Sequence, residues 1–296
     1  DQLHPSGKMD NSTYELIGAA YAEVEAKEPW CNGTRNIADI GILSSDAVSE
    51  IHNRDNHADD GAARLLLEGQ FLFDVIDADM PFGPYRALVL PDDVQVAGEL
   101  LAKINAFLDG GGKLLLTGTS GMHRDGKGFA FDIGADHEGQ SPYQPDFILP
   151  VEALTPDFVH DPLVMYVPSQ RIKVHSSNAA QSLGKVFDPY FNRSYKHFCS
   201  HQHAPPRTKP SEYDCGVVAE NIMYLAHPVF TQYWATGAVA HKEYVQRAIA
   251  HLLGDDKTLE STLPSTARLT LMDQAAEDRY VLHLLYANTV NRGGPM

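Results

Sequence analysis

A serine between glycines follows a short apolar run near the middle of the chain. The run is Lys113 to Thr117, and the turn after it reads Gly118-Thr119-Ser120-Gly121. Ligands gather beyond the carboxyl ends of such strands in open α/β sheets, and hydrolases present a serine nucleophile there in a G-x-S-x-G turn. The spacing here departs from that motif. Ser120 is therefore a candidate nucleophile, and the alternative is a turn whose hydroxyls satisfy backbone groups.

One histidine is a candidate base for that serine. His227 closes the strand-like run 222–226 and precedes Pro228 and Val229. A base needs a nucleophile within reach, so the alternative is a histidine that ends a strand and forms local hydrogen bonds. If both residues react, the chain is a stand-alone enzyme of the hydrolase or amidotransferase fold that uses Ser120 and His227.

A second cluster has the residue types of a metal site: His197, Cys199, His201 and His203. Alternate residues of an extended segment share one side, and these types bind zinc, although no standard zinc spacing is present. The same segment contains aromatic and basic residues, which favour a ring-lined surface for a sugar or another chain; they are Phe191, Arg193, Tyr195, Lys196 and Phe198. A zinc-binding module, a contact surface and ordinary loop packing all stay open.

Several aspartates lie in or beside the expected strands, and glycoside hydrolysis needs a pair of carboxylates. They are Asp39, Asp74, Asp77, Asp92 and Asp93. Because aspartate is mostly exposed, we interpret these residues as a solvated acidic rim and as helix caps. In particular, residues 92–95 are expected to cap the helix that follows them.

The elements that position these residues alternate between strand and helix patterns. Strands are expected at 37–43, 73–77, 87–90 and 113–117, and helices at 61–71 and 96–107. This alternation predicts a parallel sheet with right-handed crossovers and helices on both faces.

The alternation stops in a long excursion, residues 121–215, which is rich in Pro, Gly, Asp, His and aromatic residues. Such excursions are usually functional or interfacial. Short strands are expected within it at 163–167 and 171–174. The alternation resumes with strands at 215–219 and 222–226, a helical region from 227 to 254 that Gly237 divides, and antiparallel strands at 267–272 and 280–286.

The ends of the chain predict a piece of a longer polypeptide. Residues 12–15 form a capping-box pattern, and the apolar spacing after it predicts an amphipathic helix over residues 12–28 that needs a partner surface. The chain opens on Asp1 rather than Met, and it closes soon after a strand-like run.

Composition excludes some functions. The 296 residues carry a net charge of −16, which would repel the phosphates of nucleic acids. The sequence has no long charge-free apolar run to span a membrane. Its three scattered cysteines fit a reducing compartment, so we expect a cytoplasmic protein without a disulfide framework.

The block from Ile37 to Gly254 resembles the middle, trimerisation-type domain of family-42 β-galactosidases and related glycosidases. The resemblance rests on residues 86–91, 107–113, 190–201 and 222–234. It implies an α/β, flavodoxin-like or class I amidotransferase-like parallel sheet. Residues 1–36 resemble the end of a catalytic (β/α)8 barrel, residues 37–258 the trimerisation domain, and residues 259–296 the start of a C-terminal β-domain.

The resemblance also implies that the sheet has lost the chemistry of an amidotransferase. That family has a cysteine in the turn after the central strand and a His-Pro-Glu segment later, whereas this chain has Thr119-Ser120 and Val229 at the corresponding places. A triad without its nucleophile and its orienting acid is inactive. We therefore expect a scaffold, with no catalytic residue, metal or cofactor in this piece.

On this interpretation the two catalytic carboxylates of a retaining glycosidase lie mostly in a part of the polypeptide upstream of Asp1. The whole protein would be a glycoside hydrolase that binds carbohydrate through the missing barrel and forms homo-oligomers, with a trimer as one expected form. Barrel active sites form at the carboxyl face, and the aromatic-histidine loop around Tyr195 to His203 would close over the barrel of its own or of a neighbouring subunit. The implied substrate-side residues are Asp1, His4, Tyr195, His197, His201 and His203.

Overall fold

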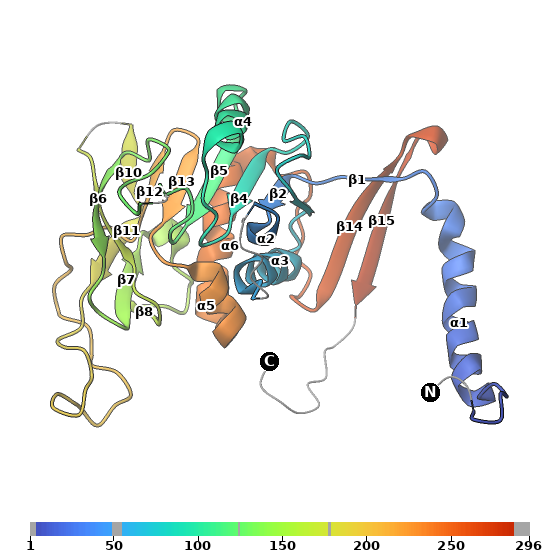
Figure 1. Cartoon of the computed structure of the whole chain (residues 1–296), viewed down its shortest axis with the longest axis horizontal. Coiled ribbons are helices and arrows are strands. Elements are labelled where there is room, and N and C mark those ends of the chain that lie inside the picture. The colour runs from blue at the N-terminus through green and yellow to red at the C-terminus, as the bar shows by residue number, and fades with distance from the viewer. Residues whose placement is uncertain (1–3, 49–54, 124, 177–178, 287–296) are drawn as a thin grey trace. The chain divides into compact units, whose positions relative to one another are not determined.

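The computed structural model describes residues 4–48, 55–123, 125–176 and 179–286 (Figure 1). Contacts within the chain divide it into two units, residues 1–37 with 269–285 and residues 38–268 with 286–296. Among the described residues, no helix combines the length and apolar composition needed to cross a bilayer.

The first unit contains one long helix and a small sheet. Helix α1 (Asn11–Lys27) confirms a helix in the predicted place, but its cap is Asp10, which accepts the N–H groups of Ser12 and Thr13. A 3-10 turn, Glu28–Trp30, follows α1. The sheet has the order β1 (Arg35–Asn36), β14 (Ala267–Gln274) and β15 (Arg279–Tyr286), with a second 3-10 turn, Ala275–Glu277, between the last two strands.

No residue of α1 is buried. Its apolar side chains Leu16, Tyr21 and Val24 are 62–77% exposed. The sheet, in contrast, is tied to the turn after α1, because the Gln274 amide donates to the carbonyls of Pro29 and Asn32 at 2.9 and 2.8 Å.

The second unit is built on a seven-stranded sheet. Its order is β10 (Ala180–Ser182), β12 (Gly216–Ala219), β13 (Ile222–Leu225), β5 (Lys113–Thr117), β4 (Ala87–Leu90), β2 (Ile40–Leu43) and β3 (Phe73–Ile76). From β13 to β3 all neighbours are parallel, which confirms an α/β sheet. The prediction of a wholly parallel sheet is wrong at one edge, where β12 runs antiparallel to both β13 and β10. The turn Glu220–Asn221 is too short for a parallel crossover.

Alternate residues of the central strands enter two different cores. On β4, Ala87 and Val89 join one core, and Leu88 and Leu90 join the other. The first core is covered by α3 (His57–Glu68), α5 (Val229–Thr236) and α6 (Val239–Leu253), and the second by α4 (Gly98–Asp109). Helices therefore cover both faces, as predicted. A short helix α2 (Ser45–Val48) follows β2, and a 3-10 turn, Gly254–Asp256, follows α6.

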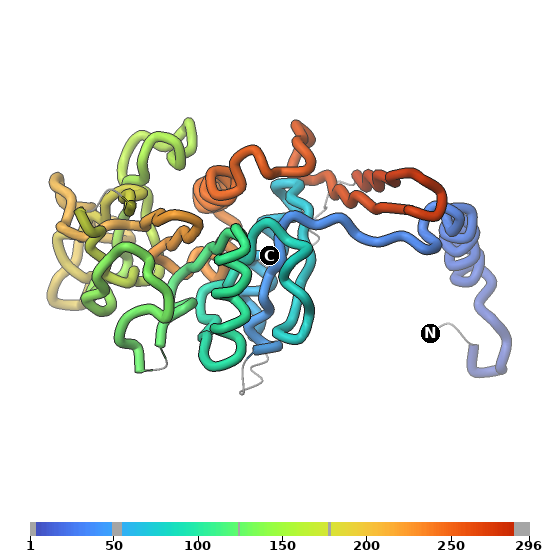
Figure 2. The backbone as a smooth tube through the Cα atoms, turned by 90° about the horizontal axis from the view of Figure 1, so that it is seen from above, coloured from blue at the N-terminus to red at the C-terminus, as the bar shows by residue number. Residues whose placement is uncertain are grey.

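The excursion contains two small antiparallel sheets, which lie towards the β10 end of the large sheet (Figure 1). Figure 2 shows the green and yellow trace of the excursion on that side of the unit. One pairs β6 (Ala135–Gln140) with β9 (Gln170–Val174). The other has the order β11 (Gly184–Phe187), β7 (Asp146–Pro150) and β8 (Leu163–Met165), with a 3-10 turn, Glu152–Leu154, after β7. The expected strands near 163–167 and 171–174 are thus present as β8 and β9.

Candidate functional site

The chain segments that follow β13, β5 and β4 meet at the carboxyl edge of the sheet, because these three strands are adjacent and parallel. The turn after β5 has a glycine, Gly118, with φ +58°. A Cβ atom there would lie 2.7 Å from the carbonyl oxygen of Asp92 and 3.2 Å from Cα of Pro228. The three segments approach so closely because this residue has no side chain.

The candidate nucleophile Ser120 lies within this contact. Its side chain is fully buried, and its Oγ accepts the N–H of Val94 at 3.0 Å. Among the described residues, Ser120 and His227 share no hydrogen bond. The hydroxyl thus satisfies a backbone group, and the hypothesis of a Ser120–His227 hydrolase has no geometric support.

Asp92 has a structural role that differs from the expected one. Helix α4 begins after Ala97 without a side-chain cap. The Asp92 carboxylate instead accepts the N–H groups of Phe230 and Thr231 in the first turn of α5, at 3.3 and 2.6 Å, and the hydroxyl of Thr117 at 2.7 Å. Burial raises the pKa of Asp92, and these hydrogen bonds oppose the shift. Asp92 therefore joins β4, β5 and α5.

His227 is fully buried and does have a carboxylate partner. Its Nε2 lies 2.5 Å from Oδ1 of Asp146, the first residue of β7. The other carboxylate oxygen accepts both the N–H and the hydroxyl of Ser169, at 3.2 and 2.7 Å. The prediction that His227 lacks an orienting acid is wrong, since the acid comes from the excursion rather than from position 229. Among the described residues, no nucleophilic side chain is hydrogen-bonded to His227, and the pair attaches the excursion to the sheet.

A second buried histidine, His241, belongs to a separate hydrogen-bond network near the first. His241 of α6 donates from Nε2 to the carbonyl of Val164 at 2.8 Å, and its Nδ1 lies 3.3 Å from the amide nitrogen of Gln232. Gln232 in turn accepts the N–H of Tyr166 at 2.7 Å. Burial lowers the pKa of His241, which keeps this ring neutral, and the neighbouring His227 acts in the same direction.

The Tyr166 ring connects this network to the aromatic-histidine loop, residues 190–206. Its centroid lies 5.9 Å from that of His241 and 5.6 Å from that of His203. The loop is closed at its base by a bridge between Pro189 and Pro206. Beyond this base, Tyr195 and Phe198 are 86% and 70% exposed. Rings this exposed are suited to a partner or a ligand.

The polar cluster in the loop does not form a metal site. The Cys199 thiol donates to the carbonyls of His201 and His203 at 3.5 and 3.3 Å, and the His197 ring lies 6.4 Å from that of Phe191. No three His, Cys, Asp or Glu side chains among the described residues are grouped to hold a metal ion. The hypothesis of a zinc-binding module is therefore wrong for this arrangement.

The remaining predicted substrate-side residues lie in the first unit. His4 is exposed and shares a hydrogen bond of 2.8 Å with Ser6. It borders a hollow of about 670 Å³ formed by residues 4–12. Asp1 lies outside the described residues.

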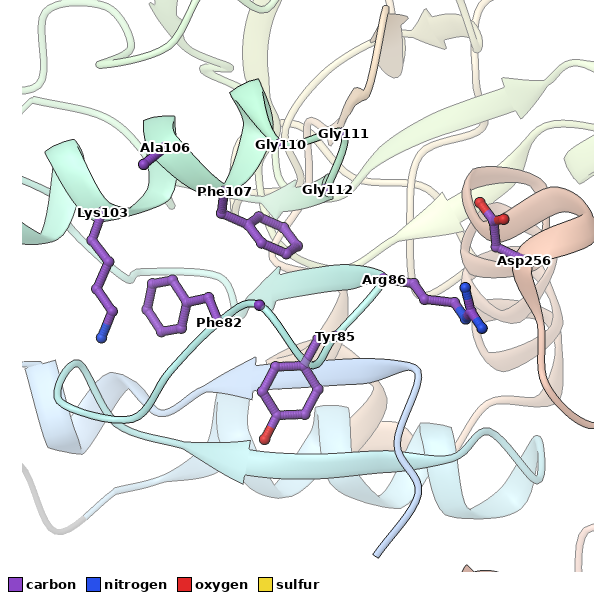
Figure 3. A pocket seen from close by; sticks show the side chains of 11 residues that line it. Phe82, Tyr85, Arg86, Lys103, Ala106, Phe107, Gly110, Gly111, Gly112 and Asp256 are labelled. Carbon is purple, nitrogen blue, oxygen red and sulfur yellow. The ribbon is translucent and has the colours of Figure 1, made fainter.

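A different hollow, of about 490 Å³, lies at the amino edge of the large sheet between α4 and the loop before β4 (Figure 3). Figure 3 shows the rings of Phe82, Tyr85 and Phe107 along it. Its charged groups have internal partners: Arg86 pairs with Asp39, Asp256 with Lys113, and Lys103 donates to the carbonyls of Ala78 and Met80.

The aspartates expected on a solvated rim have different environments. Asp39 is buried and accepts hydrogen bonds from Thr258 as well as from Arg86, which corrects the expectation for this residue. Asp74 accepts the hydroxyl of Tyr85, and Asp77 accepts the N–H groups of a turn. Asp93 is exposed, as expected. Each carboxylate thus has its own structural partner or faces solvent.

Sequence reasoning missed Asp146, Ser169, Tyr166, Gln232 and His241. His241 could have been found, because it shares helical spacing with the buried Tyr244, Val245 and Ala248. For Asp146 the only signal was an acid at the start of an apolar run, Phe147-Ile148-Leu149.

Comparison with solved structures identifies the kind of domain. Alpha-L-fucosidase isoenzyme 2 from Paenibacillus thiaminolyticus is 40% identical, with a TM-score of 0.92; the match covers 99% of this chain and 44% of that chain. The cold-adapted beta-galactosidase from Rahnella sp. R3 has 16% identity and a TM-score of 0.62, over 91% of this chain and 39% of that chain.

A third structure, the GH42 beta-galactosidase Gan42B from G. stearothermophilus, has 15% identity and a TM-score of 0.60, over 92% of this chain and 38% of that chain. No protein-family model and no curated protein sequence matches the chain. The chain is thus a glycoside hydrolase-related domain, and it spans less than half the length of these three proteins.

Proposed function

We propose that this chain is the scaffold and oligomerisation portion of an exo-acting glycoside hydrolase. The observation that carries the proposal is the closure of the carboxyl edge: Ser120, Asp92 and His227 are buried and hydrogen-bonded to structural partners. Chemistry then belongs to another part of the protein. The 40% identity to a fucosidase makes an α-L-fucoside the first substrate to test, and a β-galactoside the second.

The finer assignments belong to the same proposal. Residues 1–36 would end a (β/α)8 catalytic barrel, residues 37–258 would form an amidotransferase-like trimerisation domain, and residues 259–296 would begin a β-domain. The exposed apolar side chains of α1, Leu16, Tyr21 and Val24, support the first assignment, because they are available to pack against another part of the protein. The three cysteines are free, which supports the proposed cytoplasmic location.

The aromatic-histidine loop is the proposed contact with substrate or with a neighbouring subunit. Its base is fixed by hydrogen bonds and the Pro189–Pro206 bridge, while Tyr195 and Phe198 are exposed. In this proposal Tyr195, His197, His201 and His203 would line a barrel of the same or of a second subunit, and His4 and Asp1 would lie on the barrel's last loop.

The test uses the full-length protein with the double substitution His197→Ala/His201→Ala. We expect kcat/KM on a nitrophenyl α-L-fucoside or β-galactoside to fall at least tenfold, or the mass of the oligomer in sedimentation to decrease. The matched control is His251→Ala, another exposed histidine. Unchanged kinetics and unchanged mass in the double variant would contradict the role of the loop.

A serine-directed covalent probe tests the remaining part of the proposal. We expect no labelling of Ser120 under conditions in which the full-length enzyme turns over its glycoside. Labelling of Ser120 would show that the carboxyl edge opens and would refute the scaffold assignment.

A further inference from the structure

A pocket of about 400 Å³ lies at the base of the aromatic-histidine loop, and none of the roles above uses it. It forms where the chain after β11 runs beside residues 207–211. The N–H of Arg207 donates to the carbonyl of Asp188 at 2.9 Å, and the N–H of Ser211 donates to that of Val186 at 2.8 Å. Residues 208–210 bulge outward between these two hydrogen bonds, because the opposite segment is shorter by two residues. The pocket walls are thus fixed by backbone hydrogen bonds.

The charges around this pocket do not balance. Among the described residues that line it, Asp188 is the acidic one. It forms an ion pair with Arg171 at 3.1 Å, and both side chains are less than one-fifth exposed. Arg171 is itself held over the ring of Tyr213, 4.3 Å from the centroid. Arg171 is thus the ion-pair partner of Asp188, and Arg207 adds an electrostatic attraction to the same carboxylate.

Two further cations line the pocket, Arg207 and Lys209, and both are exposed. In the part of the chain that the structure describes, neither forms an ion pair. The Arg207 Nε donates to the carbonyl of Pro189 at 3.4 Å, which holds the base of the guanidinium and leaves its terminal nitrogens available. This local excess of positive charge occurs on a chain with a net charge of −16.

An aromatic surface stands beside these cations. The side chain of Tyr190 is 52% exposed, and its backbone N–H is fixed by the carbonyl of Pro205 at 3.2 Å. The Arg207 guanidinium lies 6.0 Å from the centre of its ring. An aromatic face can pack against the C–H face of a sugar ring, while a guanidinium can bind a carboxylate or sulfate through two parallel hydrogen bonds.

We propose that this pocket binds a pyranose that carries a carboxylate or a sulfate group. The Tyr190 ring packs against the sugar, Arg207 and Lys209 bind the anionic group, and the hydroxyl of Thr208 is available to the sugar hydroxyls. The pocket volume lies within the range of small-molecule sites, about 300–1,000 Å³. This inference rests on the proposed function only in its choice of a saccharide as the ligand.

The test is calorimetric titration of the full-length enzyme with three probes: D-galacturonate, methyl β-D-galactopyranoside and inorganic sulfate. We expect galacturonate to bind with a Kd of about 1 mM, at least tenfold more tightly than either of the other probes. The affinity should fall as salt is added, because exposed charges are screened.

Variants locate the site. Arg207→Gln/Lys209→Gln should weaken galacturonate binding at least tenfold, and Tyr190→Ala should weaken it without changing the response to sulfate. The matched control, Arg35→Gln/Lys127→Gln, removes two exposed cations elsewhere and should leave the affinity unchanged.

Four outcomes would overturn the proposal: no saturable galacturonate binding, equally tight binding of the neutral glycoside, equally tight binding of sulfate alone, or full affinity in the Arg207/Lys209 variant. Because the readout is binding rather than turnover, it is independent of the proposed function. Loss of the loop's role in turnover would leave the galacturonate affinity unchanged.

Discussion

The carboxyl edge of the large sheet and the aromatic-histidine loop both contain histidines, in opposite environments. At the edge, Ser120, Asp92 and His227 are buried and bonded to internal partners. In the loop, His197 and His201 are exposed, as are the rings of Tyr195 and Phe198. The comparison teaches that position in the fold alone does not make a residue functional. Access to solvent separates the two regions here, although the edge is where open α/β sheets usually place their chemistry.

The largest expected effect concerns the His227–Asp146 pair. His227→Ala leaves a fully buried carboxylate without its ring partner, and breaking such a pair costs roughly 3–5 kcal/mol. We expect a loss of this size in the free energy of unfolding, measured in urea, whereas the exposed-site control His251→Ala should change it by less than about 0.5 kcal/mol. A loss below about 1 kcal/mol would show that the carboxyl edge of the sheet tolerates an Asp146 carboxylate without its His227 partner.

The next effect concerns Asp92. Asp92→Ala leaves the Phe230 and Thr231 N–H groups and the Thr117 hydroxyl without their acceptor. Losing a helix cap and leaving buried donors unpaired costs about 2–3 kcal/mol. Thermal unfolding should show this loss, while Asp93→Ala, at the exposed neighbouring carboxylate, should have little effect. Similar losses in both variants would contradict the capping role.

The smallest effect is a pH dependence at His241. Its folded-state pKa lies below the ordinary histidine value of 6.5, so its contribution to stability is complete above that value and is lost as the pH falls through the lower, folded-state pKa. Protonation places a proton on Nδ1, which faces the Gln232 amide nitrogen and so disrupts the contact beneath Tyr166.

This dependence is measured as the difference in unfolding free energy between the natural chain and His241→Gln, from about pH 5 to pH 8. We expect the advantage of the natural chain to shrink as the pH falls. The protection of the Tyr166 amide against hydrogen exchange, expressed relative to its intrinsic exchange rate at each pH, should fall in parallel, because its N–H bond to Gln232 depends on this network. A pH-independent difference would contradict the assignment of His241 as neutral.

The sequence predicted the elements whose signal is local. The runs at 87–90 and 113–117 and the helix after Asp10 have regular apolar spacing, and each has the expected type in the structure. Long-range partners could not be predicted in this way. Asp146 and His227 are 81 residues apart and are joined through an irregular excursion, so no periodic pattern connects them. The reversal of β12 depends on a two-residue turn, and the sequence does not show which neighbour a strand will pair with.

Asp92 was expected to cap a helix, and it does so, but the helix is not the one that the sequence indicated. An aspartate before a helical pattern reads as the cap of that helix, yet this carboxylate caps α5, which begins more than a hundred residues later. The choice is made by strand order, which brings the end of β4 to the start of α5 across β5.

The close approach at Gly118 has a consequence for how this edge can change through mutation. The turn after β5 contacts Asp92 and Pro228 through a position with no room for a Cβ atom. Installing a cysteine at 120 would place a thiol against the Val94 N–H rather than in a pocket. Catalysis at this edge would require coordinated changes in the three segments that meet at Gly118. Evolution and protein engineering therefore have easier routes to new activity in the exposed loop, where single substitutions meet no such barrier.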